Sequence, residues 1–254
     1  MPRTPIVAGN WKMNTTAVSA AELVEGIKAA GLDAVSGVEK VLCPPYLYLP
    51  LVAAAVKGTS LSVGAQDVHW EEKGAFTGEV SASMLKDFAT HVIIGHSERR
   101  AYFGETDEGV NLKLRAALAH ELIPIVCVGE TGTERETGMT NDVLRRQVRG
   151  ALEGVELPGT AVIAYEPVWA IGTGVAATVA DATEAIGFIR AEIASLQGDA
   201  VAAAVRVLYG GSVSPANIAE FVAQPDIDGG LVGGASLQAQ SFADMVRSVA
   251  GVKV

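Results

Sequence analysis

The chain has 254 residues, of which 49% are hydrophobic and 19% are charged, enough apolar sequence for one domain with a large core. Its formal net charge of −10 argues against a nucleic-acid partner or an anionic membrane surface, because both would repel an acidic protein. The amino-terminal residues lack the apolar region of a signal peptide, and no apolar run reaches the roughly 18 residues of a membrane span, so we expect a cytoplasmic protein.

Apolar runs of strand length recur along the chain and alternate with helical patterns. The predicted strands are residues 6–8, 38–43, 60–65, 91–94, 122–128, 161–165, 206–209 and 227–232. The predicted helices are residues 18–30, 47–57, 82–88, 107–120, 141–152, 179–196, 215–223 and 242–249. Such alternation implies parallel pairing through right-handed crossovers. It predicts an α/β fold with a closed (β/α)8 barrel as a single domain over residues 1–254, with an open doubly wound sheet as the alternative.

Two helix starts carry their own sequence signals. Ser214 before Pro215 predicts an N-cap followed by the first helical residue. Thr140, followed by two polar residues, predicts the start of another helix.

Residues 66–80 do not fit this alternation. The segment, QDVHWEEKGAFTGEV, is long for a connection between a strand and a helix, and it contains Trp70 and Phe76. Aromatic side chains on such a loop favour contact with a partner over disorder. We therefore expect this loop to pack against another protein surface.

Polar and charged residues follow several predicted strands, and a barrel brings these strand ends together. Asn10 and Lys12 follow the first strand, His96 the fourth and Glu166 the sixth. An apolar, uncharged stretch follows Glu166, and we interpret it as a cover that excludes water and raises the pKa of the carboxyl group. A base, an imidazole and a cation around one point suit proton transfer beside a carbonyl group.

Glycine turns follow the last two predicted strands. The seventh strand leads into Gly210, Gly211 and Ser212, and the eighth leads into Gly233 and Gly234. Glycine lets main-chain N–H groups approach a ligand closely, and the helix expected after Ser212 would present an N-terminus that attracts anions. Loops at these positions commonly form a phosphate site in such barrels, so a small phosphorylated metabolite is the expected ligand.

Seven segments, in order along the chain, resemble one enzyme family. They are AGNWKMN (8–14), GAFTGE (74–79), IGHSERR (94–100), CVGE (127–130), YEPVWAIGTG (165–174), YGGSV (209–213) and GGASL (233–237). No single motif decides the match, but the ensemble is highly specific. The chain resembles the bacterial triosephosphate isomerases.

The resemblance implies a homodimeric barrel that interconverts dihydroxyacetone phosphate and D-glyceraldehyde 3-phosphate without a cofactor or a metal ion. Glu166 would move the proton between the two carbons, and a neutral His96 would polarise the carbonyl group. Lys12 and Asn10 would stabilise the enediolate oxygen, and Glu98 would pair with Lys12 and position it. An equilibrating enzyme of this kind would serve both glycolysis and gluconeogenesis.

The same resemblance places the substrate phosphate against the main chain of Gly172, Gly233 and Gly234, with Ser212 beside them. Residues 167–177 would form a lid that closes over the intermediate and excludes water.

The resemblance also assigns the hinges of the lid and the contact between subunits. Residues 168–170 would be the first hinge. The second hinge, residues 175–177, reads Val-Ala-Ala where many family members begin with lysine, so the opening rates of the family are not transferred to this chain. In the family the long third loop inserts into the neighbouring subunit, and Thr77 would contact the active-site residues of that neighbour.

Two other functions can be drawn from the same residues. Lys12 could form a Schiff base, as in barrel aldolases, although a lysine placed to bind phosphate should stay charged. A phosphate-binding barrel without turnover would be expected to lose its base or its electrophile first, whereas Glu166, His96 and Lys12 are all present.

Cofactor and metal motifs are weak. Gly172, Gly174 and Ala177 read as G-x-G-x-x-A, but their distance from the strand and the lack of an acid about 20 residues later disfavour a dinucleotide site. The histidines show no HxH or HxxxH spacing, so we expect no zinc site. Cys43 and Cys127 lie in apolar runs without a CxxC motif, which predicts buried, reduced thiols.

Overall fold

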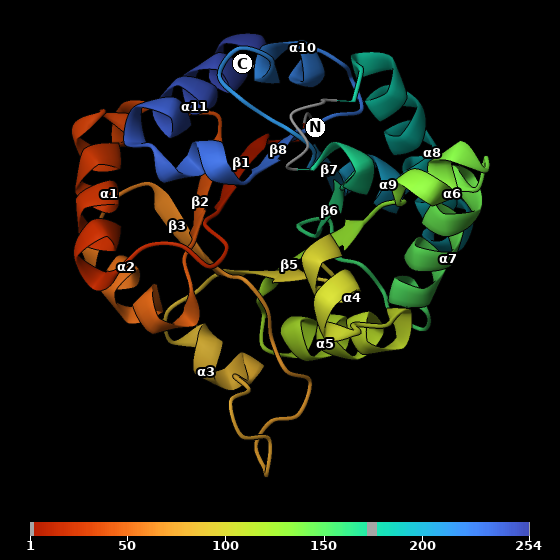
Figure 1. Cartoon of the computed structure of the whole chain (residues 1–254), viewed down its shortest axis with the longest axis horizontal. Coiled ribbons are helices and arrows are strands. Elements are labelled where there is room, and N and C mark those ends of the chain that lie inside the picture. Colours follow the sequence, from red (N-terminus) through yellow and green to blue (C-terminus); the bar gives the residue numbers. More distant parts are fainter. Residues whose placement is uncertain (1–2, 172–176, 254) are drawn as a thin grey trace.

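The computed structural model describes residues 3–171 and 177–253, and within them eight parallel strands close into a barrel in sequence order (Figure 1). The strands are β1 (Ile6–Asn10), β2 (Glu39–Cys43), β3 (Leu61–Ala65), β4 (His91–Ile94), β5 (Ile123–Val128), β6 (Val162–Tyr165), β7 (Arg206–Tyr209) and β8 (Gly229–Val232). β1 pairs with both β2 and β8, which excludes the open doubly wound sheet. Each predicted strand overlaps an observed one, so the closed barrel is confirmed.

Helices cover the outside of the barrel (Figure 1). They are α1 (Ala17–Ala29), α2 (Leu49–Ala55), α3 (Ala82–Lys86), α4 (Ser97–Phe103), α5 (Asp107–Ala119), α6 (Gly132–Glu136), α7 (Thr140–Leu152), α8 (Val179–Gln197), α9 (Asp199–Ala204), α10 (Ile218–Val222) and α11 (Ala239–Lys253). α7 begins at Thr140, one residue before the predicted range, and Met139 is its N-cap. The short helices α4, α6 and α9 do not follow from apolar periodicity. α6, for example, is held by a capping box between Thr131 and Glu134.

The predicted helix after β7 begins later than expected. α10 starts at Ile218, so the prediction of Ser214 and Pro215 as N-cap and first helical residue is wrong. The Asn217 side chain explains the difference, because its Oδ1 accepts from the Ser214 N–H at 2.8 Å and its Nδ2 donates to Ser212 O at 3.1 Å. These bonds fold the connection into a turn. The N-terminus of a helix therefore does not follow Ser212 directly.

Two apolar clusters form the core. The larger lies between the strands and the surrounding helices, and the smaller fills the barrel with side chains from the strands. Cys43 and Cys127 belong to the smaller cluster and are buried, free thiols, as predicted. Burial raises the pKa of Cys43 to about 12, which leaves this thiol protonated.

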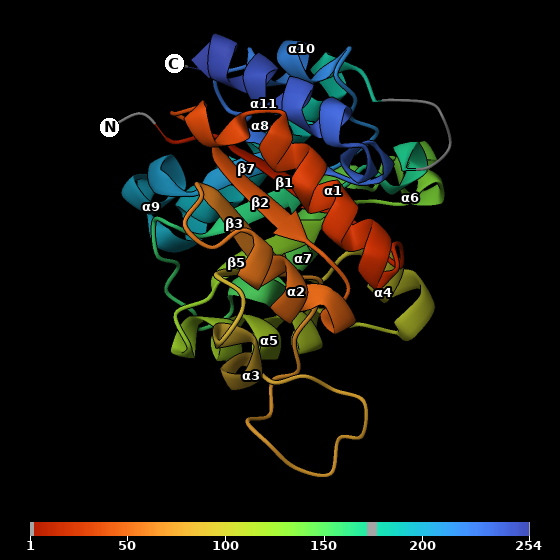
Figure 2. The ribbon, with the colours of Figure 1, turned by 90° about the vertical axis from the view of Figure 1, so that its left-hand side faces the viewer.

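Residues 66–80 leave the barrel after β3 and project well beyond the helices (Figures 1 and 2). His69 organises the base of this loop, because its main-chain N–H donates a hydrogen bond to Val80 O at 2.8 Å. Its ring lies 4.4 Å from the ring of Trp70 and 4.5 Å from that of Phe76.

Among the helices of residues 3–171 and 177–253, none has both the length and the apolar composition that crossing a membrane requires.

Charged side chains close the amino-terminal end of the barrel. Glu39, His91 and Arg206 are the first residues of β2, β4 and β7. One Glu39 oxygen lies 3.0 Å from His91 Nε2, and the other accepts a hydrogen bond from Arg206 at 2.5 Å. Burial raises the pKa of Glu39, but His91 and Arg206 outweigh this effect and lower the pKa from 4.5 to about 2.

This shift predicts how stability depends on pH. A carboxyl group whose pKa is lower in the folded chain stabilises the fold fully above its unfolded pKa, and this contribution is lost as the pH falls through the folded pKa. We therefore expect Glu39→Gln to reduce the free energy of unfolding at neutral pH by at most about 3 kcal/mol. The difference in the free energy of unfolding between the variant and the parent should disappear as the pH falls from 4.5 to about 2. Urea unfolding at one protein concentration measures it, and a gap that does not change with pH would contradict the expectation.

Candidate active site

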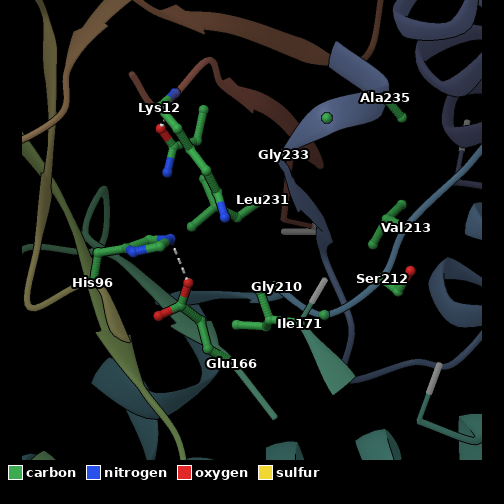
Figure 3. Close-up of a pocket in the computed structure, with 13 residues that line it drawn as sticks. Lys12, His96, Glu166, Ile171, Gly210, Ser212, Val213, Leu231, Gly233 and Ala235 are labelled. Carbon is green, nitrogen blue, oxygen red and sulfur yellow. Dashed lines mark hydrogen bonds and ion pairs between the residues drawn. The ribbon is translucent and has the colours of Figure 1, made fainter. Parts of the chain in front are cut away.

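The residues predicted from separate strand ends meet at the carboxyl-terminal end of the barrel, around a pocket of about 250 Å³ (Figure 3). The pocket is lined by Asn10, Lys12, His96, Glu166, Ile171, Gly210, Gly211, Ser212, Val213, Leu231, Gly233, Gly234 and Ala235. This set contains every predicted catalytic and phosphate-binding residue that the structure describes. The remaining one, Gly172, lies outside the described residues.

His96 and Glu166 face each other in the pocket (Figure 3), with His96 Nε2 2.9 Å from Glu166 Oε1. On the other side of the ring, the Glu98 N–H donates to His96 Nδ1 at 3.2 Å. His96 is thereby the N-cap of α4, which fixes the orientation of its ring. Because Nδ1 accepts a hydrogen bond, the proton of a neutral imidazole lies on Nε2 and points to Glu166.

The Glu166 carboxyl group is fully buried among donors that favour its charged form. Burial raises its pKa, but His96 and the Ser97 N–H, which donates to Oε2 at 2.8 Å, outweigh burial and lower the pKa. The expectation of a raised pKa for Glu166 is therefore wrong for this arrangement. Conversely, burial lowers the pKa of His96, and the Glu166 carboxylate outweighs it, so that this pKa is raised.

Lys12 enters the pocket from a strained backbone position after β1 (Figure 3). Its φ of 52° lies in the left-handed region, which costs a residue with a side chain on the order of 1–3 kcal/mol. Two hydrogen bonds hold it there: the Lys12 N–H donates to Asn10 Oδ1 at 3.0 Å, and Gln66 Nε2 donates to Lys12 O at 2.9 Å. The ammonium group pairs with Glu98 at 2.6 Å, which is the pairing expected from the sequence.

The glycine turns after β7 and β8 form another wall of the pocket (Figure 3). The protein itself leaves little room for a side chain at Gly210 and Gly211, since a Cβ atom would lie 3.0 Å from Glu166 Cγ and 2.2 Å from Tyr209 Oη, respectively. At Gly234 a Cβ atom would meet no described atom within 4 Å. Packing within the described chain therefore does not require glycine at Gly234, whose main chain is open to a ligand.

The first turn of the predicted lid is anchored to the barrel. The short helix η3 (Val168–Ala170) follows β6, and within it Trp169 Nε1 donates to Glu130 Oε1 at 2.8 Å. The buried Glu130 carboxylate also accepts from Tyr165 Oη at 3.1 Å. Residues 172–176, which contain the middle of the predicted lid, part of the second hinge and both glycines of the dinucleotide motif, lie outside the described residues.

Sequence reasoning missed several contributors to the pocket and its support. Leu231 on β8 supplies apolar lining, and strand alternation could have identified it as pointing into the barrel. Ile171, which also lines the pocket, belongs to the apolar stretch that was interpreted as a cover. Ser97 acts through its main-chain N–H, for which a side-chain motif gives no signal. Over residues 3–171 and 177–253, no group of three or more His, Cys, Asp or Glu side chains is placed to hold a metal ion.

Comparison with known proteins decides the relationship that the motifs indicate. The family model of triosephosphate isomerase matches residues 5–249. The chain belongs to the triosephosphate isomerase family. The triosephosphate isomerase of Moorella thermoacetica is 57% identical over 249 residues, which cover 96% of this chain and 98% of that protein. That of Citrifermentans bemidjiense is 55% identical over 250 residues (96% and 98%), and one from Dehalococcoides mccartyi is 50% identical over 251 residues (99% and 98%).

The resemblance to triosephosphate isomerases is thus confirmed over nearly the whole barrel. Three of the matching motifs cover the carboxyl-terminal ends of β1, β4 and β6, and they supply Lys12, His96 and Glu166 to one pocket.

Proposed function

We infer that this chain is a triosephosphate isomerase, which interconverts dihydroxyacetone phosphate and D-glyceraldehyde 3-phosphate. The observation that carries the mechanism is the meeting of Glu166, His96 and Lys12 in one pocket. A carboxylate, a hydrogen-bond donor and an ammonium group can remove a proton beside a carbonyl group and stabilise the resulting enediolate. A coupled assay of D-glyceraldehyde 3-phosphate turnover, with no added cofactor and with a chelator present, tests this function, and absence of turnover would contradict it. A cytoplasmic location stays a prediction.

Glu166 is the base in the proposed mechanism. Its two oxygens accept from Ser97 and His96, so the carboxylate must turn away from these donors to reach a substrate carbon. Leaving them removes the contacts that lower the pKa of Glu166, whereas burial still raises it. The base therefore becomes stronger as it meets the substrate, which is the direction that proton abstraction requires.

His96 is the electrophile in the proposed mechanism. When Glu166 turns toward the substrate, the charge that raises the pKa of His96 moves away, and burial then favours the neutral imidazole. The Nε2–H becomes free to donate to the carbonyl oxygen of the substrate, and the Glu98 N–H continues to hold Nδ1.

Lys12, Asn10 and the glycine turns would hold the anionic parts of the substrate. Lys12 brings the positive charge that an enediolate and a phosphate require, against a net charge of −10 for the whole chain. The phosphate would lie by the main chain of Gly233 and Gly234 with Ser212 beside them, and Gly172 is the proposed fourth contact. The ion pair of Lys12 disfavours the Schiff-base alternative, because imine formation requires a neutral amine.

A homodimer is the second part of the proposal, supported by the loop over residues 66–80. Trp70 is 39% exposed and Phe76 is 41% exposed on this loop, and Thr77 is also exposed. A cavity of about 280 Å³ beside the pocket could receive the loop of a second copy; it is lined by Asn10, Lys12, Met13, Pro45, Tyr46, Gln66, Asp67, His96, Glu98, Arg99 and Phe103. Because Lys12 and His96 line both spaces, a partner loop seated there would complete the wall of each active site.

Replacing Thr77 with Arg should break this dimer. An unpaired charge in a packed interface costs several kcal/mol, so the dissociation constant should rise by about two orders of magnitude or more. Ser195→Arg on the exposed side of α8 adds the same charge away from the loop and serves as the control. Sedimentation should show monomers with reduced activity for Thr77→Arg alone, and a fully active dimer of unchanged affinity would contradict the inserted loop.

A further inference from the structure

Gln147, on α7, binds both polar groups of one main-chain residue at the end of β5. The Gly129 N–H donates to Gln147 Oε1 at 2.7 Å, and Gln147 Nε2 donates to Gly129 O at 3.2 Å. The Gln147 side chain is buried, with 4% of the residue exposed. A single side chain therefore fixes the position of Gly129 relative to α7.

Gly129 is in direct contact with the main chain of the catalytic base. A Cβ atom on Gly129 would lie 1.7 Å from Glu166 O, so the two backbones touch. The neighbouring residues tie the same two segments together, since the Glu166 N–H donates to Val128 O at 2.7 Å and the Val168 N–H donates to a main-chain oxygen of the β5 loop at 3.0 Å. The backbone of Glu166 thus rests on the residues that Gln147 holds.

A cleft borders the segments that carry Gln147 and Glu166. Its volume is about 390 Å³, and Ser97, Gln147 and Glu166 are among its lining residues. Close packing normally holds buried side chains in place. Beside a cleft, the position of the Glu166 segment depends more strongly on the hydrogen bonds that fix its backbone.

We propose that Gln147 is a positioning residue for the isomerisation: through Gly129 it holds the Glu166 backbone, and hence the carboxylate, at its working distance from the substrate. This inference rests on the proposed function. It assigns to Gln147 an effect on the chemical step rather than on substrate binding, because Gln147 lies outside the substrate pocket. Misplacement of a reacting group by about 1 Å can lower a rate on the order of 100-fold.

The chain provides a matched control in Gln197 on α8. The Leu157 N–H donates to Gln197 Oε1 at 2.9 Å, and Gln197 Nε2 donates to Val155 O at 2.7 Å. This is the same kind of double hydrogen bond to main chain, but it lies before β6, at the opposite end of the barrel from the pocket. Loss of either glutamine removes the same two types of bond.

The experiment compares Gln147→Met with Gln197→Met, since methionine keeps the length of the side chain and removes both hydrogen bonds. We expect Gln147→Met to lower kcat about 10- to 100-fold with KM changed by less than about threefold. The acidic limb of its pH profile for kcat/KM should move to higher pH, because displacement loosens the contacts that lower the pKa of Glu166. Gln197→Met should lose comparable stability to urea with kcat and pH profile unchanged.

Equal losses of kcat in the two variants, or an unchanged kcat and pH profile in Gln147→Met, would overturn the proposal. If Gln147→Met does not fold, Gln147→Glu replaces it, because a carboxylate still accepts from the Gly129 N–H but cannot donate to Gly129 O. A kcat equal to that of the parent in that variant would also overturn it. A parent protein without isomerase activity would instead reject the proposed function, so the two failures are distinguishable.

Discussion

Glu166→Gln should lower kcat by several orders of magnitude, beyond the roughly 10²–10⁴-fold often assigned to general acid–base catalysis. Glutamine has the shape of glutamate and can accept the Ser97 N–H, but its amide cannot take a proton from carbon. Among the described residues that line the pocket, Glu166 is the sole carboxylate, so no neighbour in that set can replace it. KM should change little, because the base contributes mainly in the transition state.

The control for this variant is Glu192→Gln. Glu192 is also buried and pairs with Arg145 and Arg149, but it lies on α8 away from the pocket. Steady-state kinetics in both directions should show wild-type kcat for Glu192→Gln. Near-normal turnover in Glu166→Gln would show that another group removes the proton.

Lys12→Met should lower kcat/KM by about three orders of magnitude or more. Loss of one oxyanion donor costs roughly 10²–10³ in kcat, and loss of the charge that meets the phosphate should also raise KM. The variant leaves Glu98 without its 2.6 Å partner beside the pocket, which adds repulsion toward an anionic substrate. The dependence of kcat/KM on ionic strength should also weaken, since steering of the substrate by this charge is lost.

Lys28→Met is the matched control for charge. Lys28 forms an ion pair with Glu25 at 2.8 Å on the surface of α1, so its removal changes the net charge equally. Its kinetics should match those of the parent. A loss of less than tenfold for Lys12→Met would mean that this ammonium does not contact the reacting oxygen or the phosphate.

The barrel and its site could be predicted because few local side-chain contacts compete with the strand pattern that determines them. Strands buried on both faces read as continuous apolar runs. Closure of the sheet then brings every strand end to one face, so Lys12, His96 and Glu166 could be grouped without coordinates. The predictions that were wrong each depended on a single contact. The Asn217 side chain turns the chain before α10, and propensity at Ser214 and Pro215 does not reveal this competing hydrogen bond.

Side chains that bind main chain were missed for the same reason. Gln66 holds Lys12, and Gln147 holds Gly129, across large separations in sequence. When a glutamine side chain binds a backbone group, no sequence motif marks the pair, so the contact cannot be predicted from spacing. The pKa of Glu166 was predicted in the wrong direction because the apolar stretch indicates burial, whereas the Ser97 N–H that offsets burial belongs to another loop.

The most direct test of the proposed mechanism measures where the transferred hydrogen comes from rather than how fast the reaction runs. The parent protein converts D-glyceraldehyde 3-phosphate in D2O with a chelator present, and the dihydroxyacetone phosphate formed is analysed for deuterium. If Glu166 carries the proton, a fraction of the product should contain solvent deuterium at the carbon that receives the proton, because a protonated carboxyl group exchanges with water. Deuterated product formed at the parent's rate by Glu166→Gln, or no product at all from the parent, would contradict proton transfer by this carboxylate.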